Sequence, residues 1–224
     1  MFYVIFALLF LALSILPGMW TRATLARYSK PRKDIQYNGE EFAKALISKF
    51  KLHNVSVEAA PNNGDHYDPT DKVVRLSPDR MKTNSLTAIA VAAHEVGHAL
   101  QDATQYPGFS ASGKVRIAAH HFRQMGTWVF VLAPVVAIIS KNPIIGMVTA
   151  AIALMSYFLS AAVHLFNLPI EFDASFKRAL PILEDCEYLS ESDLKAARKI
   201  LKAAAMTYVA GALLNILPFG RLRR

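Results

Sequence analysis

The sequence has one cysteine and little charge. With Cys186 alone the chain can form no internal disulfide, which excludes a disulfide-stapled secreted domain and fits a reducing compartment. Only 19% of the 224 residues are charged, whereas 53% are hydrophobic and the mean hydropathy is +0.26. This balance excludes a disordered chain, and the lack of a repeat excludes a collagen-like one. The composition is too apolar for an ordinary water-soluble fold.

Charge is absent altogether from four windows of 21, 17, 29 and 18 residues, namely 1–21, 124–140, 142–170 and 203–220. A helix needs about 17–25 apolar residues to cross a bilayer core about 30 Å thick, so each window is long enough to span. We therefore expect a mainly α, multi-pass protein of the cell membrane, with the lipid bilayer around its transmembrane helices.

Basic residues set the expected orientation. None precedes Phe2, and Arg22 and Arg27 follow the first window, which is the reverse of a cleaved signal peptide. Because the Lys/Arg-rich flank stays in the cytoplasm, residues 1–21 are predicted to be an uncleaved anchor. The net charge of +8 does not indicate nucleic-acid binding, since acids interleave with the basic residues and no basic stretch alternates with stacking aromatics.

The rest of the chain divides into four expected segments. Residues 22–123 carry recurrent charge and turn residues, which predicts a small α+β layer in the cytoplasm. Residues 124–168 predict a transmembrane hairpin, because so short a connection as Lys141-Asn142-Pro143 makes its helices antiparallel. The hairpin returns residues 169–202 to the cytoplasm. Residues 203–224 hold a hydrophobic segment, either transmembrane or interfacial, and a basic tail.

Within the cytoplasmic layer the apolar periodicity predicts alternating elements. In chain order these are a helix over 40–51, a strand over 54–59, a polar loop over 65–71, a strand over 72–76, and a helix over 86–102 with Asn84 or Ser85 as its N-cap. The second strand is either an edge strand, to which an extended peptide adds by backbone pairing, or an interior strand.

The motif HEVGH, formed by His94, Glu95 and His98, lies inside the last of these helices. A spacing of four brings two imidazoles to one helix face, one turn apart, so both can bind one metal ion, and Glu95 is placed to act on a water as general base. Neutral imidazoles suit Zn²⁺, whose catalytic sites take three protein ligands. Two ordinary surface histidines are a poorer interpretation, because the surrounding helix is apolar.

The third ligand has to come from a distant segment. The position at which metzincin-type sites carry another histidine is occupied by Thr104. The residues alone leave five candidates open, which are Glu171, Asp173, Asp102, His120 and His121.

Four stretches, HEVGHALQ, DHYDP, VVRLSP and LPIEFDASFKRAL, together resemble the YugP family of membrane zinc metallopeptidases over most of the chain, and more distantly HtpX and the CAAX prenyl proteases. In those families a Glu-Phe-x-Ala-Asp stretch supplies the third zinc ligand. The resemblance implies a zincin-like layer with Glu171 in that role, while Ser175 stands where the distant families have aspartate. The aspartate's role of orienting a ligand histidine then passes to Asp173 or another group, or is absent.

The predicted function is therefore an integral-membrane zinc endopeptidase whose substrates are proteins or peptides in or near the membrane. His94, His98 and Glu171 hold the metal, and Glu95 is the base. His66 or Tyr67 is either an oxyanion donor or part of a solvated turn. Two alternatives are a non-catalytic zinc-bound scaffold or chaperone-like adaptor, and a site-two-type intramembrane protease.

Overall fold

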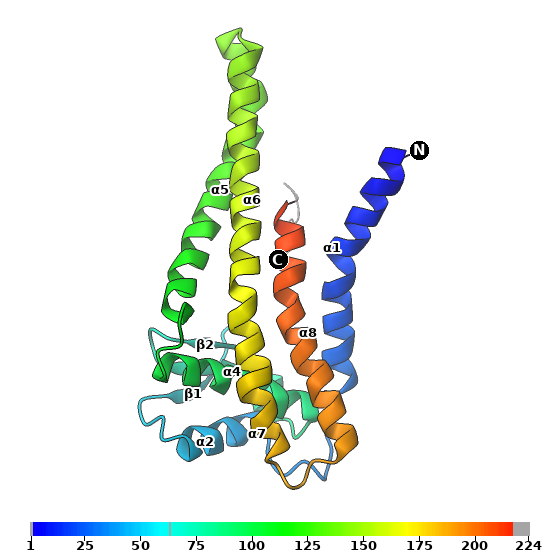
Figure 1. Cartoon of the computed structure of the whole chain (residues 1–224), viewed down its shortest axis with the longest axis vertical. Helices are drawn as coiled ribbons and strands as arrows, with labels where there is room; N and C mark the ends of the chain where they lie inside the picture. The colour runs from blue at the N-terminus through cyan, green and yellow to red at the C-terminus, as the bar shows by residue number, and fades with distance from the viewer. Residues whose placement is uncertain (1, 63, 217–224) are drawn as a thin grey trace. The chain divides into compact units, whose positions relative to one another are not determined.

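The computed structural model describes residues 2–62 and 64–216 (Figure 1). The chain is mainly helical with one small sheet, as the sequence predicts. It divides into two compact units. One, the helical unit, contains the chain up to Pro17, Ala111–Leu168 and the chain from Tyr208; the other, the mixed unit, contains Gly18–Ser110 and Pro169–Thr207.

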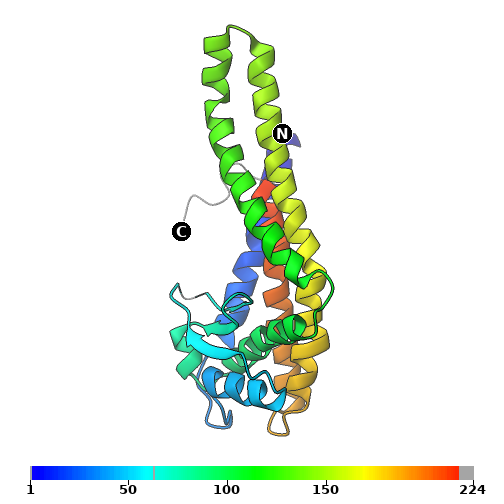
Figure 2. The ribbon, with the colours of Figure 1, turned by 90° about the vertical axis from the view of Figure 1, so that its left-hand side faces the viewer.

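Two helices, α5 (Phe109–Ser140) and α6 (Pro143–Phe172), provide most of the helical unit. Figures 1 and 2 show them side by side as a hairpin. The two helices approach closely at Gly146, where an added Cβ would lie only 2.4 Å from the Cβ of Ala137. Two helical stretches among the described residues, Phe109–Ser140 and Pro143–Glu184, are long and apolar enough to cross a membrane. Only 11% and 28% of their most apolar windows are buried, so most of this apolar surface is exposed.

The other two uncharged windows also fall on helices. The first lies on α1 (Phe2–Arg27) and the last on α8 (Glu191–Ile216), and residues 217–224 are outside the described part of the chain.

The sheet belongs to the mixed unit and has the strand order β1-β3-β2, made of β1 (Ser56–Ala59), β2 (His66–Asp68) and β3 (Val73–Leu76). β3 pairs in parallel with β1 and antiparallel with β2, so the edge-strand alternative for 72–76 is wrong and the interior alternative is confirmed. The prediction of a polar loop over 65–71 is also wrong in part, because residues 66–68 form β2. Tyr67 of β2 is buried at 7% exposure and lies opposite Val74, which makes this short segment a strand despite its polar flanks.

The central element of the mixed unit is α4 (Leu86–Ala103), which contacts β2, β3 and α2 (Gly39–Lys49). Its N-cap is Ser85, whose Oγ accepts a hydrogen bond from the Ala88 backbone N–H at 3.2 Å. Short helix α3 (Pro78–Lys82) precedes it. Fourteen of the 18 residues of α4 are buried, so this helix forms the core on which the other elements pack.

A π-helical turn lies against α4. The α6 helix continues through Pro169 to Phe172, and η1 (Asp173–Ala179) and α7 (Leu180–Glu184) follow without a break. η1 packs on α4 where the HEVGH motif has its glycine: a Cβ on Gly97 would lie 2.9 Å from the Ala174 carbonyl oxygen. The glycine therefore permits the close backbone approach that brings residues 171–175 to the two histidines.

Candidate metal centre

Three side chains from two distant segments converge in the mixed unit. Among the described residues, His94, His98 and Glu171 form the one group of at least three His, Cys, Asp or Glu residues that could hold a metal ion. Their ligand atoms all lie within 4.8 Å of one another. Both Nε2 atoms point at the same carboxylate oxygen, with His94 Nε2 at 3.3 Å and His98 Nε2 at 3.4 Å from Glu171 Oε2.

The far nitrogen of each imidazole is held by a different neighbour. His94 Nδ1 lies 3.1 Å from Ser175 Oγ, and Ser175 is completely buried. With Nε2 directed at Glu171, we assign the proton to Nδ1, which donates it to Ser175. Ser175 is thus positioned to orient His94, a role for which the sequence left open Asp173, another group or none.

His98 is held by a longer chain of hydrogen bonds. Its Nδ1 donates to Gln101 Oε1 at 2.9 Å. Gln101 Nε2 in turn donates to the Ile170 carbonyl at 2.8 Å and to Asp173 Oδ2 at 2.9 Å. The same Asp173 oxygen accepts a bond from Arg178 Nε at 2.8 Å. Asp173 therefore supports the centre indirectly, through Gln101, while Gln101 ties α4 to the residue before Glu171.

Charge and burial perturb two groups of α4. Burial lowers the pKa of His98, but the charge and hydrogen bond of the Glu171 carboxylate outweigh burial and raise that pKa to about 9. Burial also raises the pKa of Glu95, and the charges of His94 and His98 oppose this only in part. A carboxylate with a raised pKa is better suited to take up and release a proton near neutral pH.

The two oxyanion candidates lie on β2. The Tyr67 hydroxyl donates to Asp102 Oδ2 at 2.7 Å, and Asp102 is one helical turn after His98. The Tyr67 ring lies 6.4 Å from that of Phe109, which stacks on His98 at 5.9 Å. His66 is exposed, and its Nδ1 lies 2.9 Å from the Gly64 carbonyl oxygen.

The remaining ligand candidates are not part of this group of three. Asp102 accepts bonds from Tyr67 and from Lys72 Nζ at 2.5 Å, and Asp173 from Gln101 and Arg178. His120 and His121 are exposed residues of α5, in the helical unit.

Residues 3–223 match the family described as "Putative neutral zinc metallopeptidase". The chain belongs to this family. It is also 33% identical over 221 residues to the "Putative membrane protease YugP" of Bacillus subtilis (strain 168), covering 96% of this chain and 92% of that protein. No solved structure matches the chain.

The zinc that this metallopeptidase family uses fits the three side chains. Ligand atoms about 2.0–2.1 Å from a tetrahedral Zn²⁺ are about 3.3–3.4 Å apart. The two separations between imidazole nitrogen and carboxylate oxygen, 3.3 and 3.4 Å, already have this value. Two imidazoles and a carboxylate are also a ligand set of known catalytic zinc sites.

Sequence reasoning missed two residues that support the candidate metal centre, Gln101 and Arg178. A signal for Gln101 was present, because it follows His98 by three residues on a predicted helix and so shares its face. Arg178 gave no such signal, because it reaches Asp173 across five residues of a π-helix.

Proposed function

We propose that this metallopeptidase is an integral-membrane endopeptidase in which His94, His98 and Glu171 hold the zinc and Glu95 is the general base. The observation that carries the proposal is the convergence of both Nε2 atoms on one Glu171 oxygen at 3.3 and 3.4 Å, next to a buried Glu95. When bound there, Zn²⁺ supplies a Lewis acid that polarises a carbonyl and acidifies water.

Glu95 performs the proton transfers in this proposal. It follows His94 directly on α4, and only 6% of its surface is exposed. Its carboxylate takes a proton from the attacking water and then gives it to the leaving amine of the cleaved peptide bond. The raised pKa of Glu95 makes its carboxylate a stronger base for the first of these transfers.

The edge strand β2 is the proposed docking place for the substrate backbone. One side of β2 pairs with β3, and Tyr67 fixes β2 to α4 through Asp102, so its other edge can accept an extended peptide. Of the two oxyanion candidates we favour His66. Donation by Tyr67 would require its bond to Asp102 to break, whereas His66 directs only Nδ1 at Gly64.

The membrane setting is proposed from the sequence and the helices together. The uncharged windows and the exposed apolar surface of α5 and α6 support a multi-pass protein with membrane-associated substrates. The basic residues at the C-terminal end of α1 support a cytoplasmic active site. In a Cys186→Ser background, single cysteines at Thr70 and Asn142 are expected to be labelled from opposite sides. Labelling of Thr70 from outside the cell would contradict this orientation.

The catalytic proposal is tested with Glu95→Gln. This variant keeps the three zinc ligands and loses the base, so we expect stoichiometric zinc and no cleavage of an unfolded, membrane-associated substrate. The matched control is Glu58→Gln, which makes the same substitution at an exposed residue of β1. This variant should cleave the substrate at the wild-type rate. Wild-type rates in Glu95→Gln would refute the assignment of the base. Zinc-loaded wild-type protein that cleaves no substrate would favour the scaffold or adaptor function.

A site-two-type intramembrane protease is less well supported. Such an enzyme needs its metal-binding helix within the bilayer, but α4 is not one of the two helical stretches of the described chain that are apolar and long enough to span. It is instead the core helix of the mixed unit.

A further inference from the structure

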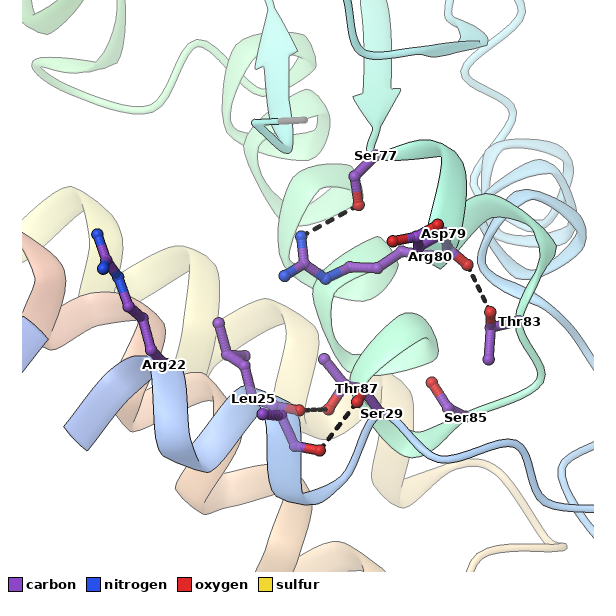
Figure 3. A pocket seen from close by; sticks show the side chains of 10 residues that line it. Arg22, Leu25, Ser29, Ser77, Asp79, Arg80, Thr83, Ser85 and Thr87 are labelled. Atoms are coloured by element: carbon purple, nitrogen blue, oxygen red, sulfur yellow. Dashed lines mark hydrogen bonds between the residues drawn. The ribbon is translucent and has the colours of Figure 1, made fainter. Parts of the chain in front are cut away.

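A cavity of about 510 Å³ lies in the mixed unit, between the end of α1 and the segment that joins β3 to α4 (Figure 3). None of the proposed zinc ligands lines it. Eight of its ten lining residues carry a polar or charged side chain, with Leu25 and Ala26 as the exceptions. Pockets for ordinary drug-like molecules are predominantly hydrophobic, so this lining indicates a polar ligand group.

Two arginines supply donors on different walls of the cavity (Figure 3). Arg22 of α1 forms no hydrogen bond or ion pair with any described residue. Arg80 of α3 pairs with Asp65 and with Ser77 Oγ through NH1 alone, which leaves Nε and NH2 without a partner in the described chain. Guanidinium groups with open N–H donors favour phosphate and carboxylate oxygens.

Two buried serines add further donors. Ser77 is 6% exposed and its Oγ accepts a bond from Arg80; Ser85 is 2% exposed and its Oγ accepts one from the Ala88 backbone. A hydroxyl also has a proton to donate, and neither serine donates it to a described residue. A buried donor without an acceptor is costly, so these two hydroxyls also indicate a ligand that accepts hydrogen bonds.

Acidic residues limit how much negative charge the ligand carries. Asp79 lines the cavity, and Asp65 is the ion-pair partner of Arg80. The two positive and two negative side chains balance, so a doubly charged anion gains little there. A singly charged group with several acceptor oxygens, such as a phosphodiester, matches this arrangement of open donors and balanced charge.

The stretch of α1 just before Arg22 exposes two large apolar side chains. Met19 and Trp20 are 59% and 42% exposed. A phospholipid combines a phosphodiester with acyl chains, and tryptophan and arginine commonly mark the level of lipid headgroups. We propose that the cavity binds the headgroup of a membrane phospholipid, with Arg22 and Arg80 on the phosphate and an acyl chain along Met19 and Trp20.

The test measures lipid binding to the full-length, zinc-loaded protein in a non-ionic detergent by native mass spectrometry. Phosphatidylglycerol is titrated into wild type, Arg22→Ala, Arg22→Lys and the control Arg27→Ala. Arg27 is an exposed arginine five residues later on α1 that does not line the cavity. We expect Arg22→Ala to weaken binding about tenfold or more, Arg22→Lys to restore part of it, and Arg27→Ala to change it less than about twofold.

Three further ligands distinguish a lipid site from a free-anion site and from a peptide site. Diacylglycerol and inorganic phosphate should both bind much more weakly than phosphatidylglycerol, and a short acidic peptide should not displace the lipid. Equal losses in Arg22→Ala and Arg27→Ala would overturn the proposal, because they would show non-specific attraction. Inorganic phosphate binding as tightly as the lipid would show a free-anion site, and displacement by the peptide would show a peptide site; either result would overturn it.

Discussion

The Gln101 side chain makes the sharpest prediction about the metal centre. It is completely buried, accepts a bond from His98 and donates to both Ile170 and Asp173. It therefore fixes the tautomer and ring orientation of one proposed ligand, His98, and also holds α4 against the segment that carries another proposed ligand, Glu171. Gln101→Leu keeps a similar volume and removes all three hydrogen bonds.

The expected magnitude follows from these bonds. Loss of the group that orients a metal-bound histidine lowers metal affinity about 10–100-fold, or about 1.4–2.8 kcal/mol. The unfolding free energy is expected to fall as well, by about 1–3 kcal/mol, because the Ile170 carbonyl loses a donor while Asp173 keeps Arg178. Asp173→Asn should weaken zinc binding less than Gln101→Leu, since an amide oxygen can still accept the Gln101 bond.

The assay is competition for zinc between the protein and a chromophoric chelator. Gln36→Leu is the matched control, because it makes the same exchange at an exposed glutamine outside the candidate centre. Cobalt substitution adds a second measurement, since its visible spectrum reports ligand geometry independently of activity. Unchanged zinc affinity in Gln101→Leu, or an equal loss in Gln36→Leu, would refute the positioning role.

Three other predictions concern the same centre. Glu171→Ala should lower zinc content sharply, and unchanged stoichiometry would assign the third ligand elsewhere. Ser175→Ala should weaken zinc binding about tenfold in the chelator assay, because His94 loses its Nδ1 partner. In chelator-treated protein the ion pair of protonated His98 with Glu171 stabilises the fold fully below about pH 6.5 and is lost as the pH rises through about 9, so the thermal midpoint attributable to this pair should fall over that range. A midpoint that Glu171→Gln leaves equally pH-dependent would contradict this.

Local patterns were sufficient for the elements that lie on one continuous stretch of chain. The apolar period and the cap residue predicted α4 to within a residue or two, and the four-residue spacing placed His94 and His98 on one face. Parts of the sheet were harder to predict. β2 has three residues and polar flanks, and it becomes a strand only because β3 pairs with it, a contact that no local pattern contains.

The second half of the centre depends on a π-helix, which explains why its residues were difficult to place. On an α-helix, residues five apart point about 140° away from each other. The wider π-turn of η1 brings Arg178 back over Asp173, while Glu171 and Ser175 reach one histidine pair from the same segment. The serine at position 175 is short, and it reaches His94 because Gly97 lets the η1 backbone approach α4 within contact distance. A longer aspartate is therefore not required here, since the close helix packing supplies the reach that the shorter side chain lacks.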